Sequence, residues 1–123
     1  MITPNPEHKA LEQDLRRAVA GEVRFDAGSR AVYAADASNY RQVPIGVVVP
    51  RSVEDVVAAV AVCHQHRAPI LARGGGTAQN GQCVNVAVVI DCSKYLKLVA
   101  AGCHGPRIAA WALPPEGAVR TEV

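Results

Sequence analysis

Residues 46–77 read GVVVPRSVEDVVAAVAVCHQHRAPILARGGGT, and this stretch decides the fold. Its first five residues are a β-branched run closed by proline, which predicts a buried strand. Ser52 and Asp55 form a variant of the capping box in which Asp takes the place usually held by Glu or Gln. Valine and alanine then recur at helical spacing to about Arg67, so the sequence predicts a helix after the strand.

The elements that follow this helix predict a parallel sheet. Pro69 ends the helix, residues 70–72 predict a second buried strand, and residues 86–91 predict a third strand. A strand, a helix and a strand with connections of this length favour a right-handed crossover and a parallel pair. We therefore expect an α/β (α+β) fold: a small parallel βαβ sheet with packed helices. Strand 86–91 is expected at an exposed edge, where it could pair with another chain or aggregate.

The residues before this stretch predict two helices and a loop. Apolar side chains fall on one face of residues 7–20, and Gly21 is a plausible stop for that helix. Asp26 would cap a second, short helix that runs to about residue 35. Residues 36–44 are polar and end in proline, which indicates a loop.

Composition excludes several classes of protein. Half of the 123 residues are apolar, only 4% are aromatic, and the net charge of +2 is spread without a basic stripe, which argues against a nucleic-acid partner. No run approaches the roughly 20 apolar residues that cross a bilayer, so no transmembrane segment is expected. The N-terminus has no apolar signal region, and the four cysteines are expected to be reduced thiols of a soluble, cytoplasmic protein.

The stretch RGGGTAQNGQ at residues 73–82 carries the chemistry. Successive glycines permit positive φ angles and remove side chains, so that backbone N–H groups can converge on a phosphate. Arg73 and Thr77 could add side-chain donors. A Walker A loop needs lysine where Gln82 stands, and a dinucleotide fingerprint needs glycine where Gln79 stands. Both motifs fail, and a flexible turn is the competing interpretation, but the position directly after a strand favours an anion site.

Taken together, these motifs resemble the FAD-binding domain of the FAD-linked oxidases related to vanillyl-alcohol oxidase. The motifs are Val-Pro50 with Ser52-x-Glu-Asp55, the loop at 73–82, Val89-Ile90-Asp91, and the upstream segment 33–41. The resemblance spans residues 7–97. It points towards D-lactate dehydrogenases, glycolate oxidase flavin subunits, and large fusions of this domain with an iron–sulfur module.

The resemblance implies FAD as cofactor and a set of residues that bind it. Backbone amides of the loop would hold the pyrophosphate, the end of the strand at Pro50 would border the adenosine, and the rest would lie beside or along the cofactor. The implied cofactor-binding residues are Pro50, Arg73, Gly74, Gly75, Gly76, Thr77, Ala78, Gly81 and Gln82. Relatives often carry Ser where this chain has Ala78, a change that removes one hydroxyl donor. Asp36 and Tyr40 could approach the flavin, but a loop anchored by the Asp36 side chain is the preferred interpretation.

No metal-binding or catalytic residue is assigned. His64 and His66 lie two apart on a helix and point in different directions, so they make a poor metal site. Cys83 and Cys92 are expected to act as small apolar residues beside the third strand. Cys103 and its neighbour His104 have no visible partner.

Three segments are expected along the chain: an N-terminal helical segment and loop at 1–45, the first lobe of an FAD-binding domain at 46–97, and an atypical tail at 98–123. The family pattern breaks after Lys97. A frameshifted or interrupted reading frame, with a disordered tail, is the preferred explanation, and a diverged strand at 108–113 is the alternative.

The expected function is FAD binding by a truncated fragment of a flavin-dependent oxidoreductase acting on small 2-hydroxy acids such as D-lactate or glycolate. The alternative is a non-catalytic subunit or inert truncated product that pairs with a separately encoded remainder of the domain. A third hypothesis is a site for a different phosphate ligand, such as another nucleotide.

Overall fold

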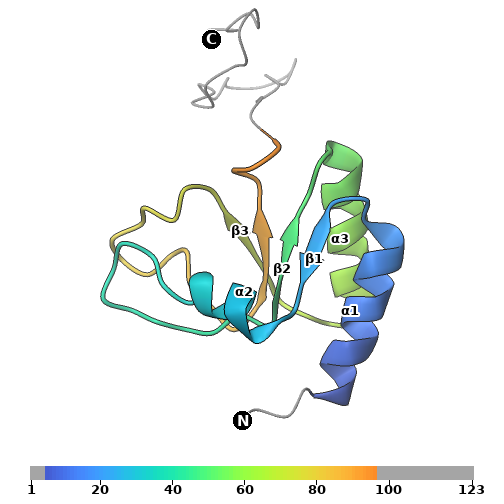
Figure 1. The fold of residues 1–123 in the computed structure, drawn as a ribbon, viewed down its shortest axis with the longest axis horizontal. Coiled ribbons are helices and arrows are strands. Elements are labelled where there is room, and N and C mark those ends of the chain that lie inside the picture. The colour runs from blue at the N-terminus through green and yellow to red at the C-terminus, as the bar shows by residue number, and fades with distance from the viewer. Residues whose placement is uncertain (1–4, 97–123) are drawn as a thin grey trace, which may run out of the picture.

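The structure, a computed structural model, describes residues 5–96 as a four-stranded sheet with helices on both faces. Helices α1 (Pro6–Ala18) and α3 (Val53–Gln65) cover one face, and the short helix α2 (Ala27–Val32) lies on the other (Figure 1). The strands are β1 (Glu22–Arg24), β2 (Gly46–Val49), β3 (Ile70–Arg73) and β4 (Val88–Asp91). The expectations for residues 97–123, including the diverged strand and Cys103 with His104, lie outside the described residues.

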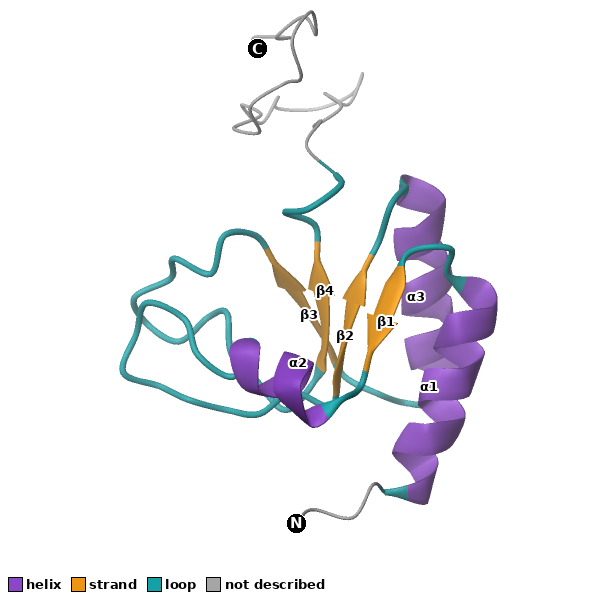
Figure 2. Ribbon diagram, in the orientation of Figure 1, coloured by secondary structure: helices purple, strands orange, loops and turns teal. Residues whose placement is uncertain are grey.

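The sheet has the order β1-β2-β4-β3, and β4 is parallel to both of its neighbours (Figure 2). The α/β class with a largely parallel sheet is confirmed. Two details of the prediction were wrong. The strands on either side of α3 do not pair with each other, because β4 lies between them. For the same reason β4 is a central strand, and the free edges of the described sheet belong to β1 and β3.

Side-chain burial explains why β4 takes the central position. Val88 and Ile90 pack with Val48 against the two long helices, whereas Val89 packs with Val47 on the opposite face. Three apolar residues in a row therefore suit a strand that is covered on both sides. In β3, by contrast, Ile70 remains 44% exposed, so the strand before the glycine loop is an edge strand and not the buried strand that was predicted.

The three predicted helices are present, with ends that differ by a few residues. Asp26 caps α2 by accepting a hydrogen bond from the Ser29 backbone N–H at 2.8 Å, but the helix stops at Val32 and not near residue 35. Leu11 and Leu15 of α1 are fully buried against α3 and the sheet. The hydrophobic periodicity therefore predicted where the helices lie, but it did not predict the residues at which they end.

Strand β1 was not predicted. It is three residues long, runs antiparallel to β2, and two of its residues, Glu22 and Arg24, are charged. Only Val23 of the strand is buried. Hydrogen bonds from Lys94 and then Tyr95 lower the pKa of Glu22 to about 2. The strand is thus held by backbone pairing and by contacts to the chain after β4, neither of which has a local signature.

The buried Asp55 joins the start of α3 to the turn after α1. Ser52 caps the helix by accepting the backbone N–H of Asp55 at 3.2 Å, as predicted. The second half of a capping box is missing, because the Asp55 carboxylate accepts the N–H of Arg51 at 2.9 Å and of Ala20 at 3.0 Å. Burial alone would raise the pKa of Asp55, but these N–H groups outweigh it and hold the pKa below its ordinary value.

Asp55→Asn should destabilise the chain by about 1–3 kcal/mol, because the amide loses a charged acceptor and turns an N–H towards a donor. The free energy of unfolding in urea measures this loss at neutral pH. The stability that Asp55 contributes disappears as the pH falls through its lowered pKa in the folded state. The free energy of unfolding of the variant should therefore change less with acid pH than that of the unmodified chain. Glu54→Gln, on the exposed side of the same turn, is the matched control and should change stability by less than about 0.5 kcal/mol.

Candidate cofactor-binding site

The carboxyl ends of the three parallel strands lie at the same end of the sheet, and ligands bind at this end in open α/β sheets. Pro50 follows β2, and Asp91 and Arg73 end β4 and β3. The glycine loop leaves β3 at this end of the sheet and runs beside the segment that precedes β2 (Figure 2). The predicted site residues from 73 to 82 therefore share one loop, while Pro50 lies two strands away with its ring fully buried.

The glycines of the loop fall into two groups. Gly76 has a φ of +68° and Gly81 a φ of +80°, a region that disfavours other residues. A Cβ on Gly81 would lie 2.8 Å from the Tyr40 ring, and one on Gly76 would collide with the Arg73 guanidinium. Gly74 and Gly75 have neither restriction: a Cβ on Gly74 would meet nothing within 4 Å, and one on Gly75 only a methyl group at 3.7 Å. Packing within the protein therefore does not explain why residues 74 and 75 are glycines, whereas the close approach of a ligand to the backbone does.

Backbone donors are free where a phosphate would bind. Within residues 5–96 no acceptor contacts the backbone N–H groups of Gly74, Gly75, Gly76 or Thr77. Gly74, Gly75 and Thr77 are exposed, and no residue from 74 to 82 carries a charge. Adjacent unpaired N–H groups on a neutral, side-chain-poor loop fit a diphosphate, which supplies several acceptor oxygens.

The Arg73 side chain is bound to the protein itself. Its Nη1 donates to the carbonyl oxygen of Cys83 at 3.0 Å and of Tyr33 at 3.4 Å, and its Nη2 donates to that of Ala35 at 2.9 Å. The guanidinium also lies 5.2 Å from the centre of the Tyr33 ring. The sequence suggested a donor to phosphate, whereas in the structure these donors hold two loops to the end of β3.

Residues 33–41, which we call the supporting segment, contact the glycine loop at several further points. Asp36 accepts the N–H and hydroxyl of Ser38 and, at 3.3 Å, the N–H of Cys83. Hydrogen bonds with Ser38, chiefly to its hydroxyl, lower the Asp36 pKa. The N–H of Ala37 donates to the carbonyl of Gly76 at 3.1 Å. The preferred interpretation of Asp36 as a loop anchor agrees with these contacts.

A partly buried tyrosine and a buried carboxylate lie beneath the two loops. The Tyr33 hydroxyl donates to Asp91 at 2.5 Å, and Asp91 also accepts the N–H and hydroxyl of Ser93 at 2.8 and 2.6 Å. Burial, followed by the hydrogen bond to Asp91, raises the pKa of Tyr33 to about 12. Tyr33 therefore stays neutral and fixes the first residue of the supporting segment to β4.

The remaining candidates are placed as follows. Ala78 is partly buried, and Gln82 is exposed, where its side chain accepts the N–H of Asn80 at 3.2 Å. His66 contacts Asp14 at 2.7 Å and His64 is exposed on another face of α3. Across residues 5–96 no three His, Cys, Asp or Glu side chains gather as metal ligands would. In the same range no helix has the length and apolar character to cross a bilayer.

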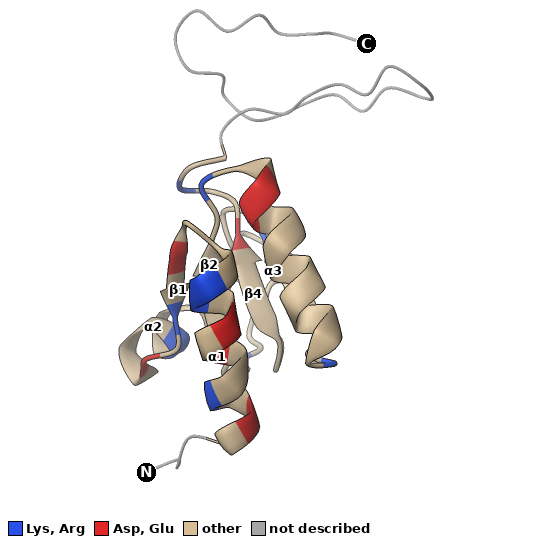
Figure 3. Ribbon diagram, turned by 90° about the vertical axis from the view of Figure 1, so that its right-hand side faces the viewer, with Lys and Arg blue, Asp and Glu red and all other residues tan. Residues whose placement is uncertain are grey.

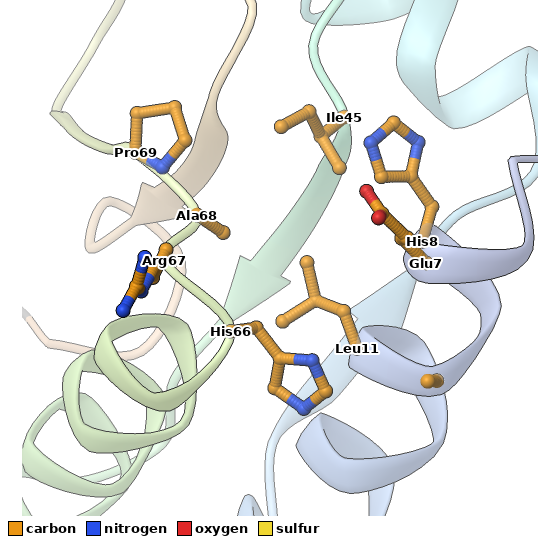
Figure 4. A pocket seen from close by; sticks show the side chains of 9 residues that line it. Glu7, His8, Leu11, Ile45, His66, Arg67, Ala68 and Pro69 are labelled. Atoms are coloured by element: carbon orange, nitrogen blue, oxygen red, sulfur yellow. The ribbon is translucent and has the colours of Figure 1, made fainter.

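A pocket of about 550 Å³ lies at the opposite end of the sheet, between the start of α1 and the end of α3 (Figure 4). Leu11 and Ile45 form its apolar side, and His8, His66 and Arg67 lie around it. It is remote from the glycine loop, which leaves the other end of β3. The pocket therefore takes no part in the candidate site.

Comparison with known proteins identifies the domain. The family described as FAD binding domain matches residues 44–110, more than half of the chain. This chain belongs to that family, and FAD is its cofactor. The match continues 13 residues beyond Lys97, where the resemblance was expected to end.

Relatives and solved structures agree with this assignment. The chain is 28% identical over 99 residues to a D-2-hydroxyglutarate dehydrogenase of Pseudomonas putida, covering 77% of this chain and 10% of that protein. It is 37% identical over 80 residues to glycolate oxidase subunit GlcD of Bacillus subtilis, covering 63% and 16%. The structure of BBE-like 1 from Physcomitrella patens aligns with a TM-score of 0.61 at 21% identity, over 75% of this chain and 21% of that chain, which establishes the shared fold.

The two groups of glycines should respond differently to alanine. Gly76→Ala should destabilise the chain by at least about 1–3 kcal/mol, because alanine is strained at this φ and meets Arg73. Gly75→Ala should leave stability unchanged or raise it by about 0.4–1 kcal/mol, because Gly75 does not have a positive φ and alanine can adopt its backbone conformation. Urea unfolding without FAD measures the free energy of unfolding of both variants. Equal losses of stability in Gly76→Ala and Gly75→Ala would contradict the separation of the glycines into two groups.

Proposed function

We propose that this chain supplies the FAD pyrophosphate site of a flavin-dependent dehydrogenase or oxidase of small 2-hydroxy acids. The observation that carries the proposal is the pair of open glycines with unpaired backbone N–H groups at the carboxyl end of β3. The chain spans about a tenth to a sixth of the two curated relatives described above, so we assign it cofactor binding and no catalytic residue.

The proposed contacts use backbone more than side chains. The N–H groups from Gly74 to Thr77 would bind the pyrophosphate oxygens, with Ala78 beside them and Gly81 and Gln82 along the cofactor. The end of β2 at Pro50 would border the adenosine. Because the loop is neutral, specificity for a diphosphate would come from the number and direction of the N–H groups.

The substrate class rests on the relatives. One is named for D-2-hydroxyglutarate and another for glycolate, and both compounds carry a hydroxyl on the carbon next to a carboxylate. Bound FAD would supply a hydride acceptor for oxidation of that carbon. The residues described here would hold the cofactor by its diphosphate, and a separately encoded remainder is a proposed partner.

The full chain should bind FAD, and binding should stabilise it. FAD at 100 times its dissociation constant should add about 2.7 kcal/mol to the free energy of unfolding. Fluorescence titration gives the affinity and thermal unfolding gives the stabilisation. ADP in place of FAD tests whether the site prefers another nucleotide. An unfolding curve that FAD leaves unchanged would remove the proposal's support.

Gly75→Val should abolish FAD binding and leave the fold intact. A Cβ at this position would meet only the Thr77 methyl group, at an ordinary contact distance, and the valine side chain would occupy the surface over which the diphosphate is proposed to lie. The helical circular dichroism and the unfolding curve without FAD should match those of the unmodified chain. Retained flavin in this variant would falsify the pyrophosphate role of the loop.

The substrate class is tested separately. The chain loaded with FAD, alone and co-expressed with the product of the downstream coding DNA, is mixed with glycolate, D-lactate or D-2-hydroxyglutarate without oxygen. Loss of the visible flavin absorbance with the co-expressed pair, but not with the chain alone, is the expected result. If the pair binds FAD but none of these acids bleaches it, the substrate class is wrong while the cofactor assignment stands.

A non-catalytic subunit that pairs with a separate remainder is the second candidate, and exposed apolar side chains favour it. Val53 and Val57 of α3 are 68% and 64% exposed, and Ile70 lies on the free edge of β3. Figure 3 shows that α3 carries little charge beyond its first turn. Sedimentation of the chain over a range of concentrations tests this candidate, which predicts association or insolubility without a partner.

A further inference from the structure

We propose that Arg73 and the supporting segment, residues 33–41, position the FAD loop, and that Arg73 acts through main-chain carbonyls and not as a phosphate ligand. The inference rests on the proposed pyrophosphate site. It adds a role for residues that precede the family match, which begins at residue 44. It also assigns Arg73, the one charged residue of the stretch 73–82, to positioning.

Arg73 joins three separate points of the chain. Its guanidinium binds the carbonyls of Tyr33 and Ala35 in the supporting segment and that of Cys83 at the far end of the glycine loop. A planar fork can reach three fixed carbonyls at once, whereas an ammonium group is a compact charge without that geometry. The Arg73 side chain, at the first residue of the stretch 73–82, therefore links both the supporting segment and the far end of the loop.

The path of this side chain explains the glycine at 76. A Cβ at that position would meet the Arg73 guanidinium, so the main chain turns closely around it. The positive φ of Gly76 is part of this turn. Arg73 thus lies against the inner side of the loop, where it can fix the direction of the neighbouring N–H groups.

Contacts from the supporting segment fix both ends of the same turn. Ala37 donates to the Gly76 carbonyl, and this bond fixes the peptide whose N–H, on Thr77, points in the opposite direction. Asp36 accepts the N–H of Cys83, and the Tyr40 ring lies against Gly81. An anion site built from backbone depends on such support, because a flip of a peptide plane replaces an N–H donor by a carbonyl acceptor.

The test compares Arg73→Lys with Arg73→Gln in the full chain. A positioning role predicts that both variants lose FAD affinity to a similar degree, about tenfold or more, because lysine keeps the charge but not the fork. Asp36→Asn should weaken binding in the same direction by loosening the other contact. Arg17→Gln on the exposed surface of α1 is the matched control and should bind FAD as the unmodified chain does.

Hydrogen exchange without FAD gives a second measurement. The Cys83 amide should exchange faster in both Arg73 variants and in Asp36→Asn, while amides of α3 keep their protection. If Arg73→Lys binds FAD within twofold of the unmodified chain and Arg73→Gln does not, the charge acts on phosphate and the proposal is overturned. Unchanged exchange at Cys83 would also overturn it. If the unmodified chain does not bind FAD, the proposed function fails, and the exchange measurement still decides the structural role of Arg73.

Discussion

Burial of β2 and β4 on both faces is the constraint on which the rest of the structure depends. Two adjacent strands of valine and isoleucine expose no polar side to water, so each face of the sheet needs a cover. Helices α1 and α3 supply one cover, with Leu11 and Leu15 as its centre. The other face is covered by Tyr33 and the loops around it, since α2 has no buried residue of its own. The loops of the candidate cofactor site therefore also complete the core.

This double use of the loops explains the polar contacts beneath them. A loop that covers apolar strands must satisfy its backbone groups, because water does not reach them from below. Arg73 does this for three carbonyls, and Asp91 holds the Tyr33 hydroxyl above the valine cluster. On the outer side, the N–H groups of Gly74 to Thr77 have no partner within residues 5–96. The two sides of the loop region therefore differ: its inner carbonyls are bound by Arg73, and its outer donors are open to a ligand.

The sequence predicted those features of the fold that depend on residues close together in the chain. Valine spacing located α3, Asp26 located the start of α2, and the triple glycine located the loop. The position of β4 between β2 and β3 could not be predicted, because the strand order depends on which strand can be buried on both faces. β1 gave no signal, since Glu22 and Arg24 carry charge and only pairing with β2 makes the strand. Arg73 before a glycine loop suggested phosphate contact because its partners at 33 and 35 are some forty residues away.

The contacts of the supporting segment bear on where this FAD-binding unit begins. The family match starts at residue 44, just before β2, which suits a unit defined by its parallel strands. The hydrogen bonds of Asp36 to Cys83 and of Ala37 to Gly76 join residues before the matched range to the glycine loop, so the unit that we propose to bind FAD includes them. Sequence similarity weights positions whose residue type is restricted, whereas Arg73 binds main-chain carbonyls that any residue supplies. The supporting segment, which acts partly through its backbone, can therefore support the proposed site and still lie before the range that the family model matches.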